Sequence, residues 1–178
     1  KKSVQETIGV WATPWGAMGG VRGPDGLRRL VLPHYTPTDL RDLLAWEHPG
    51  SLADDHAFNE LGDLCSDYFN RRQVDFSDVL CDMSVVGAFA RGVLATCRTI
   101  PFGQTRTYSQ LAMMAGEDGK ARAVAAALGA NPIPLVIPCH RVVASGGGLG
   151  GFSAPGGVEV KRRMLELERA AALPGERS

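Results

Sequence analysis

The sequence lacks the features that would place this protein in a membrane or outside the cell. None of its apolar stretches approaches the roughly 18 residues that a membrane-spanning helix requires. The first ten residues, KKSVQETIGV, have no apolar core of the kind found in export signals. The four cysteines, at positions 65, 81, 97 and 139, form no Cys-x-x-Cys motif, so the common zinc and redox motifs are excluded. These absences predict reduced thiols in a cytoplasmic protein that makes no contact with a membrane.

The net charge of the whole chain is zero, but the charges are unevenly distributed along it. The 178 residues carry 19 basic and 19 acidic side chains, and 44% of the residues are apolar, as in a folded globular protein. Residues 1–90 hold 8 basic and 13 acidic side chains, whereas residues 91–178 hold 11 basic and 6 acidic ones. An acidic half therefore precedes a basic half. The basic half suits a partner that carries phosphate, and the alternative is that the two halves pair with each other.

The first half of the chain is predicted to form a small α/β domain. Two strand-like runs within residues 9–33 flank the turn Pro24-Asp25-Gly26. A helix is expected over residues 36–48, with Thr36 as its cap and a proline at its first position. Apolar residues at helical spacing predict a second helix within residues 54–72.

The second half is predicted to be mainly helical, with helices over residues 86–97, 108–116, 120–131 and 158–173. Ser109 is expected to cap the second of these helices. The second and third helices, joined by a short glycine-containing turn, have the outline of a helix-turn-helix, although short helix pairs occur in proteins of many kinds. The third is rich in alanine, which suits either tight packing or close approach to a groove. In the second case, Arg122 is the long side chain of this helix that is available to insert into the groove.

A cysteine and a histidine adjoin at Cys139 and His140, within the stretch IPLVIPCHRVV. Prolines stiffen the approach to this pair, as expected for a side chain held against a pocket. A nearby histidine can accept the thiol proton, directly or through water, and the thiolate is the strong nucleophile. A packed, inert thiol is the alternative, because adjacency does not imply contact. The glycine-rich residues 145–157 predict a mobile or closely approached loop rather than a dinucleotide site, since their glycines do not open a helix.

The segment NPIPLVIPCHRVV, followed by this glycine-rich loop, resembles the active-site segment of the O6-alkylguanine-DNA alkyltransferases, or methylated-DNA–protein-cysteine methyltransferases. The resemblance runs from about Phe89 to Glu168 and includes the segments TYSQLA and ARAV. It implies a ribonuclease-H-like α/β domain, a small sheet plus helices, over residues 1–84. It further implies a mainly α domain with a winged helix-turn-helix DNA-binding motif over residues 85–173, and a flexible tail over residues 174–178.

The resemblance implies a catalytic role for five residues. Cys139 matches the acceptor thiol, His140 the base that deprotonates it through a water, and Glu168 the acid that orients this histidine. Asn131 matches the hinge between the recognition helix and the active-site segment. Tyr108 matches a residue that helps to rotate the target phosphate and lies beside the pocket. The implied reaction is a displacement at carbon that leaves a stable thioether, so each molecule acts once and needs neither a cofactor nor a metal.

Further residues match the family's contacts with the damaged base and the DNA. Arg122 matches the finger that fills the gap left by the extruded base. The carbonyls of Cys139 and Val142 match acceptors for the guanine amino group, and Ser153 matches a donor near the alkylated oxygen. The other expected contacts are Phe152, Gly150, Ser109, Ala123, Ala126 and Arg141. The implied partner is double-stranded DNA containing O6-alkylguanine, approached from the minor groove by a monomer in a bacterial nucleoid or a eukaryotic nucleus.

The sequence departs from the family pattern in three places. Phe152 stands where a tyrosine is frequent, Ala154-Pro155 resembles an insertion, and Gly129 replaces a basic residue of some relatives. Because Phe152 cannot donate a hydrogen bond, either Ser153, Tyr108 or backbone amides supply the donor or the reaction is slower. Two alternative functions are a non-catalytic alkyl-lesion-binding protein of the same fold and an unrelated thiol hydrolase.

Overall fold

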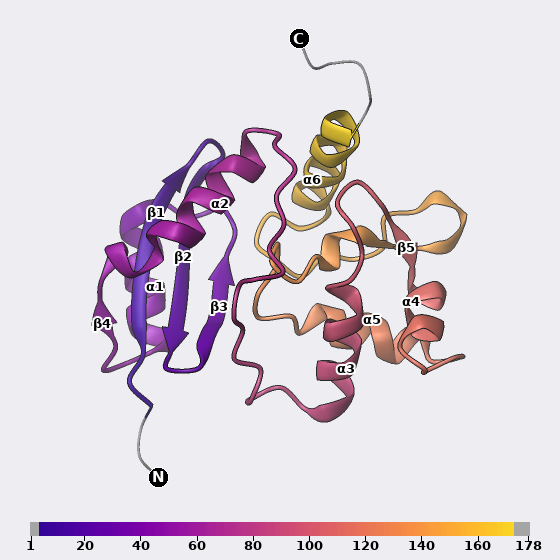
Figure 1. Ribbon diagram of the computed structural model, residues 1–178, viewed down its shortest axis with the longest axis horizontal. Coiled ribbons are helices and arrows are strands. Elements are labelled where there is room, and N and C mark those ends of the chain that lie inside the picture. The colour runs from indigo at the N-terminus through magenta and orange to yellow at the C-terminus, as the bar shows by residue number, and fades with distance from the viewer. Residues whose placement is uncertain (1–3, 173–178) are drawn as a thin grey trace. The chain divides into compact units, whose positions relative to one another are not determined.

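The computed structural model describes residues 4–172, which divide into two compact units at the junction of Met83 and Ser84 (Figure 1). The predicted tail, residues 174–178, lies outside the described residues. Within residues 4–172, no helix combines the length and the apolar character needed to cross a membrane.

The first unit is built on a four-stranded sheet with the order β3-β2-β1-β4. Its strands are β1 (Thr7–Thr13), β2 (Gly16–Gly23), β3 (Gly26–Val31) and β4 (Leu52–Ala53). Antiparallel pairing joins β1 to β2 and β2 to β3, whereas β4 runs parallel to β1. The predicted turn joins β2 to β3. The prediction of two strand-like runs was wrong by one strand, because a tight hairpin that uses Gly16 at φ 123° divides the first run.

Two helices, α1 (Pro37–Glu47) and α2 (Asn59–Phe69), lie on opposite faces of this sheet (Figure 1). The predicted start of α1 is confirmed: the Thr36 hydroxyl accepts a hydrogen bond from the backbone N–H of Asp39 at 3.2 Å, and a proline occupies the first turn. Two neighbouring glycines in β2 allow the helical layers on both faces of the sheet to pack closely against it. A Cβ atom on Gly19 would lie 2.8 Å from Leu44 of α1, and one on Gly20 would lie 3.0 Å from Phe58, which precedes α2.

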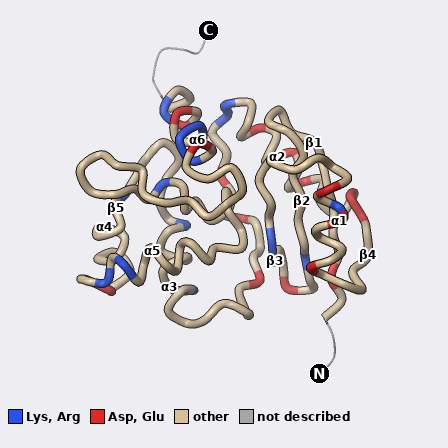
Figure 2. Tube along the Cα trace, turned by 180° about the vertical axis from the view of Figure 1, so that it is seen from behind, with Lys and Arg blue, Asp and Glu red and all other residues tan. Residues whose placement is uncertain are grey.

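The segment after α2 pairs with the edge of the sheet at Leu27. The N–H of Leu27 donates to the carbonyl of Leu80, and the N–H of Asp82 donates to the carbonyl of Leu27, both at 2.8 Å. These bonds cover the outer edge of β3, which an unpaired strand would otherwise expose. Acidic side chains recur along α1, α2 and the chain around β4, as Figure 2 shows.

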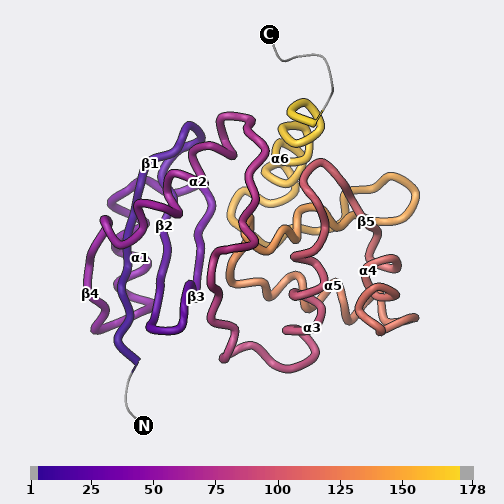
Figure 3. The backbone as a smooth tube through the Cα atoms, in the orientation of Figure 1, coloured from indigo at the N-terminus to yellow at the C-terminus, as the bar shows by residue number. Residues whose placement is uncertain are grey.

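The second unit contains the helices α3 (Ala88–Cys97), α4 (Tyr108–Met114), α5 (Ala121–Gly129) and α6 (Gly157–Ala172). The first three pack on one another around a core of buried aliphatic side chains: Val93, Leu94, Leu111, Val124 and Leu128. A short parallel pair, β5 (Arg106–Thr107) and β6 (Val142–Val143), lies beside α4. Between α5 and α6 the chain is mostly irregular (orange in Figure 3).

The predicted cap of α4 was wrong. Thr107, not Ser109, precedes the helix, and its hydroxyl accepts the backbone N–H of Gln110 at 3.1 Å. The Gln110 side chain in turn accepts the N–H of Thr107 at 2.8 Å, which completes a capping box. The reciprocal pair satisfies two backbone donors, so it outcompetes a serine two positions later. The predicted classes, a small sheet with helices followed by a mainly helical unit, are confirmed, whereas the ribonuclease-H-like topology and the wing stay predictions.

Candidate active site

The Cys-His pair lies in the interior of the second unit, on a 3-10 turn that spans Cys139–Arg141. Cys139 is 8% exposed, His140 is fully buried and Arg141 is 6% exposed. Residues 133–137, which lead to the pair, are buried as well. Leu135, at φ 76°, turns this approach back on itself, so that the N–H of Ile137 reaches the carbonyl of Ile133 at 3.0 Å.

Asn131 clamps this approach at both ends. Its side-chain oxygen accepts the N–H of Ile133 at 3.0 Å, and its amide donates to the carbonyl of Ile137 at 2.9 Å. The Asn131 side chain also lowers the pKa of the Cys139 thiol. The predicted hinge residue therefore holds the turn that leads to the thiol and favours its ionised form.

A buried charge network surrounds His140. The imidazole Nε2 hydrogen-bonds Glu168 of α6, which also accepts from Arg141 Nε at 2.7 Å and from the N–H of Gly103 at 3.0 Å. A second N–H group of Arg141, on Nη1, donates to the carbonyl of Ile100 at 2.7 Å. Arg141 is thus a support of Glu168 and its side chain is buried, while its expected contact with the base or the DNA stays a prediction.

The pKa values within this network favour a neutral imidazole beside a carboxylate. Burial alone would raise the pKa of Glu168, but hydrogen bonds and charges from His140 and Arg141 outweigh it and lower that pKa to about 2. Burial lowers the pKa of His140, while Glu168 acts in the opposite direction. With its Nε2 proton donated to Glu168, the neutral ring has its basic lone pair on Nδ1. The pair can therefore accept one proton and stabilise the resulting imidazolium.

The Cys139 thiol requires such help because burial raises its pKa. The Asn131 side chain, the charge of Lys161 and nearby backbone N–H groups act in the opposite direction. Reaction as a thiolate therefore depends on these groups and on a base.

Cys139 lines a cavity of about 310 Å³. This volume is within the range of small-ligand sites. Its walls come from α4, α5 and the loop before α6: Tyr108, Ala125, Leu128, Gly129, Cys139, Gly151, Phe152 and Ser153. Four predicted site residues, Cys139, Tyr108, Phe152 and Ser153, thus share one cavity. The Ser153 hydroxyl donates to the carbonyl of Gly129 at 2.8 Å, so its proton is already used in a hydrogen bond. The same bond attaches the loop to the end of α5.

The loop approaches Tyr108 so closely that Gly150 cannot carry a side chain. A Cβ atom there would lie 2.7 Å from Cε2 of Tyr108 and closer still to its hydroxyl. Burial raises the pKa of Tyr108, and the backbone of the next residue, Gly151, opposes the rise. The phenol therefore stays protonated and able to donate.

We expect Gly150→Ala to open the cavity and to lower the reactivity of Cys139 by at least about tenfold, because the loop must move away from Tyr108 by the width of a methyl group. The rate of Cys139 modification by an alkylated guanine measures this. Gly146→Ala is the matched control: Gly146 has nearly the same backbone, φ 77° against φ 73°, but nothing lies within 4 Å of its Cβ position. Equal losses in both variants would show that backbone strain, not the contact with Tyr108, matters.

The residues expected to touch DNA divide between the cavity and the surface. Arg122, Ala123 and Ala126 share an exposed face of α5, and Ser109 is exposed in the first turn of α4. The buried side chains of α5 are Val124, Ala127 and Leu128. Val142 is buried, and its carbonyl is engaged by Lys161.

Lys161 is the site residue that sequence reasoning missed. It is fully buried, and its ammonium donates to the carbonyls of Val142 at 2.6 Å and Gly151 at 3.1 Å. A signal was available, since Lys161, Met164 and Glu168 follow helical spacing along the buried face of α6. A lysine on an apolar stripe is uncommon enough to indicate a function.

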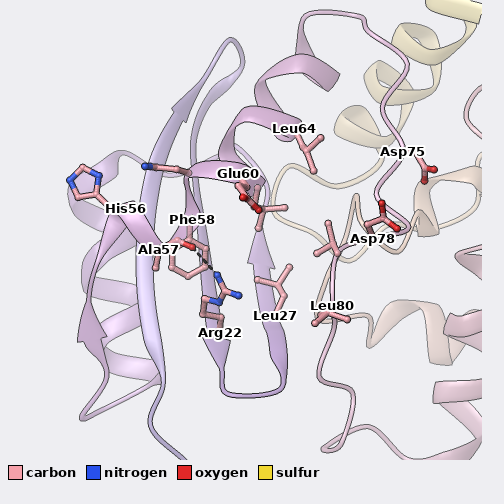
Figure 4. Close-up of a pocket in the computed structure, with 13 residues that line it drawn as sticks. Arg22, Leu27, His56, Ala57, Phe58, Glu60, Leu64, Asp75, Asp78 and Leu80 are labelled. Carbon is pink, nitrogen blue, oxygen red and sulfur yellow. Dashed lines mark hydrogen bonds between the residues drawn. The ribbon is translucent and has the colours of Figure 1, made fainter.

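A larger cavity, of about 750 Å³, lies in the first unit (Figure 4). Apolar side chains including Leu27, Phe58 and Leu64 line it together with Glu60 and Arg22, which donates to the carbonyl of Ala57 at 2.8 Å. It contains no cysteine and none of the expected site residues. The nucleophilic chemistry therefore belongs to the second unit.

The two-unit fold and the buried Cys-His-Glu cluster define a protein with a buried thiol, next to an ion-paired histidine, beside a helix pair. Residues 88–170 match the family model of the 6-O-methylguanine DNA methyltransferase DNA binding domain. The methylated-DNA–protein-cysteine methyltransferase of Methanothermobacter thermautotrophicus is 37% identical over 151 residues, which cover 85% of this chain and 78% of that one. The protein of the same name from Mycobacterium tuberculosis is 40% identical over 119 residues, 67% of this chain and 70% of the relative.

Solved structures agree with these sequence matches. The Mycobacterium tuberculosis OGT in complex with DNA superposes with a TM-score of 0.77 at 30% identity, covering 94% of this chain and 96% of that one. The O6-methylguanine methyltransferase of the same organism gives a TM-score of 0.75 at 31% identity, with 97% of each chain covered. The chain belongs to the methylated-DNA–protein-cysteine methyltransferase family.

Proposed function

We propose that this protein repairs O6-alkylguanine in double-stranded DNA by moving the alkyl group irreversibly onto its own Cys139. The observation that carries the proposal is a buried thiol that lines a cavity of about 310 Å³ and adjoins a buried histidine hydrogen-bonded to a buried glutamate. Residues 85–173 supply the DNA-binding and alkyl-acceptor functions. The protein acts as a monomer in the compartment that holds the DNA, without a cofactor.

The reaction begins with removal of the thiol proton. His140 Nδ1 accepts it through a bridging water, and Glu168 stabilises the imidazolium that forms. The thiolate then attacks the alkyl carbon, so that a sulfur–carbon bond forms as the bond from carbon to guanine O6 breaks. Negative charge leaves with the guanine oxygen, where a hydrogen-bond donor stabilises it. The thioether that forms is stable against hydrolysis, so each molecule reacts once.

The donors to the leaving oxygen are Tyr108 and backbone N–H groups of the loop rather than Phe152. Phe152 lines the cavity and stacks on the base. The Ser153 hydroxyl contributes when its proton is released from the carbonyl of Gly129. The carbonyls of Cys139 and Val142 accept the guanine amino group, which selects guanine over adenine.

The lesion must leave the duplex before the thiol can reach it, at a cost of a few kcal/mol. The exposed face of α5 enters the minor groove, where Ala123 and Ala126 allow close approach. Arg122 fills the gap that the extruded base leaves. Ser109 and Gly150 contact the DNA beside the flipped nucleotide.

We expect Arg122→Ala to slow repair of duplex DNA about tenfold to a hundredfold, while its reaction with free O6-alkylguanine stays within about twofold of wild type. The free base needs no extrusion, so it bypasses the inserted side chain. Single-turnover rates with both substrates measure the difference. The matched control is Arg162→Ala, since Arg162 is an exposed arginine of α6 that pairs with Glu159. Equal losses on duplex and free base would remove Arg122 from this role.

The function is tested by intact mass after incubation with a duplex that contains one O6-methylguanine. We expect a single gain of one methylene mass, on the peptide that holds Cys139, at a stoichiometry that never exceeds one per molecule. Repeated turnover would indicate a hydrolase instead. Tight lesion-dependent binding with unchanged mass would indicate a non-catalytic lesion-binding protein.

A further inference from the structure

Lys161 carries a buried charge that no carboxylate neutralises. It is fully buried in α6, and among the described residues none of the ion pairs within 4.0 Å includes it. Its ammonium instead binds the carbonyls of Val142 and Gly151 and lies 5.7 Å from the centre of the Tyr108 ring. Burying an ammonium without an anion is costly, so a fixed lysine here requires a reason.

The group that can supply the missing negative charge is the Cys139 thiolate. Lys161 and Cys139 interact electrostatically: the cation favours the thiolate, and the thiolate favours the cation. Burial lowers the pKa of Lys161 to about 8, which leaves it charged at neutral pH. The cost of the buried cation is thus partly offset at the moment when the thiol ionises.

Lys161 also joins two walls of the reaction cavity. The Val142 carbonyl belongs to the strand that follows the Cys139–Arg141 turn, and the Gly151 carbonyl belongs to the loop that carries Phe152. One ammonium therefore sets the separation between the thiol side of the cavity and its loop.

We propose that Lys161 is a positioning residue for alkyl transfer, whose ammonium ties the Val142 carbonyl to the Gly151 carbonyl and provides the counter-charge that stabilises the Cys139 thiolate. The proposal rests on the proposed function of Cys139. It assigns to α6 a second contribution to the site, beyond holding Glu168. Other ionisable groups close to the pair are Tyr108 from α4 and His140 and Arg141 beside the thiol.

The test compares wild type with Lys161→Met, which keeps length but removes the charge, and Lys161→Arg, which keeps the charge. Arg162→Met is the matched control on the exposed face of the same helix. The rate of methyl transfer from an O6-methylguanine duplex is followed by mass over a range of pH. We expect Lys161→Met to be about tenfold slower at neutral pH for each unit by which the thiol pKa rises. Its rate should recover as pH increases, while Arg162→Met behaves as wild type.

The shape of the pH profile separates positioning of charge from support of the fold. A purely structural loss would lower the rate by the same factor at every pH. Such a uniform loss, or a Lys161→Met rate within about threefold of wild type, would overturn the proposal. If wild type itself transfers no methyl group, the proposed function fails. If wild type transfers the methyl group and Lys161→Met does so at the same rate, only the role of Lys161 fails.

The arginine variant decides the question if Lys161→Met does not fold, as judged by near-UV circular dichroism. Above pH about 8 the lysine loses its proton, whereas an arginine remains charged. The ratio of the wild-type rate to the Lys161→Arg rate should therefore fall as pH rises through this range. A ratio that stays constant would contradict the counter-charge.

Discussion

Replacing Cys139 by serine should abolish the gain of mass from an O6-methylguanine duplex. The hydroxyl of serine is a far weaker nucleophile than a thiolate, and His140 alone cannot ionise it to a useful extent at neutral pH. The cavity and the network around Glu168 should persist, because the change replaces one atom. We therefore expect the variant to keep its affinity for DNA while the methyl group stays on guanine, which intact mass and analysis of the DNA bases together measure.

Cys81→Ser is the matched control for this experiment. Cys81 is a half-buried thiol of the first unit, whose Sγ lies 3.6 Å from the carbonyl of Val79. We expect it to accept no alkyl group and the variant to react as wild type does. A mass gain that survives in Cys139→Ser would place the acceptor on another side chain.

Replacing Glu168 by glutamine should produce the second largest loss. The imidazolium of His140 would lose its anion, so proton removal from Cys139 should slow by about a hundredfold to a thousandfold. Arg141 would also be left as a buried charge without a counter-ion, at a cost of roughly 3–5 kcal/mol in the free energy of unfolding. Single-turnover methyl transfer and thermal unfolding measure the two effects separately. Glu166→Gln, an exposed glutamate on the same helix, is the matched control.

The stability difference between wild type and Glu168→Gln should depend on pH in a defined direction. The pKa of Glu168 is lowered from 4.5 to about 2 in the folded protein, so its contribution is fully present above the unfolded value. That contribution is lost as pH falls towards about 2. The difference in unfolding free energy should therefore be constant from neutral pH down to about 5 and shrink below it. A gap that is the same at acid and neutral pH would contradict the charged network.

Local signals in the sequence were sufficient for several elements. Thr36 and the following proline identify the start of α1, because a hydroxyl cap and a residue without an N–H both suit an unpaired helix end. The proline-bounded run before Cys139 is buried as its apolar character predicts. The wrong cap of α4 has a local cause too, since the reciprocal bonds of Thr107 and Gln110 satisfy two donors where Ser109 would satisfy one.

Two roles that depend on distant partners escaped prediction, those of Arg141 and Lys161. Arg141 resembles a DNA-binding side chain when it is read beside Cys139, yet Glu168, 27 residues away, holds it in the interior. Lys161 resembles a solvated residue in the stretch VKRR, yet the carbonyls it binds come from Val142 and Gly151. The charge of a side chain shows what it can bind, but not whether a partner will be within reach.

By itself, the sequence determined the family, the acceptor thiol and most helices, because these depend on residue types at short spacing. The tertiary structure alone decided which charged side chains leave the solvent. Burial raises the cost of each charge until partners from other elements compensate it, as Glu168 does for Arg141. Those partners meet only after the chain has folded, so the network around Cys139 is a property of the fold and not of any one segment.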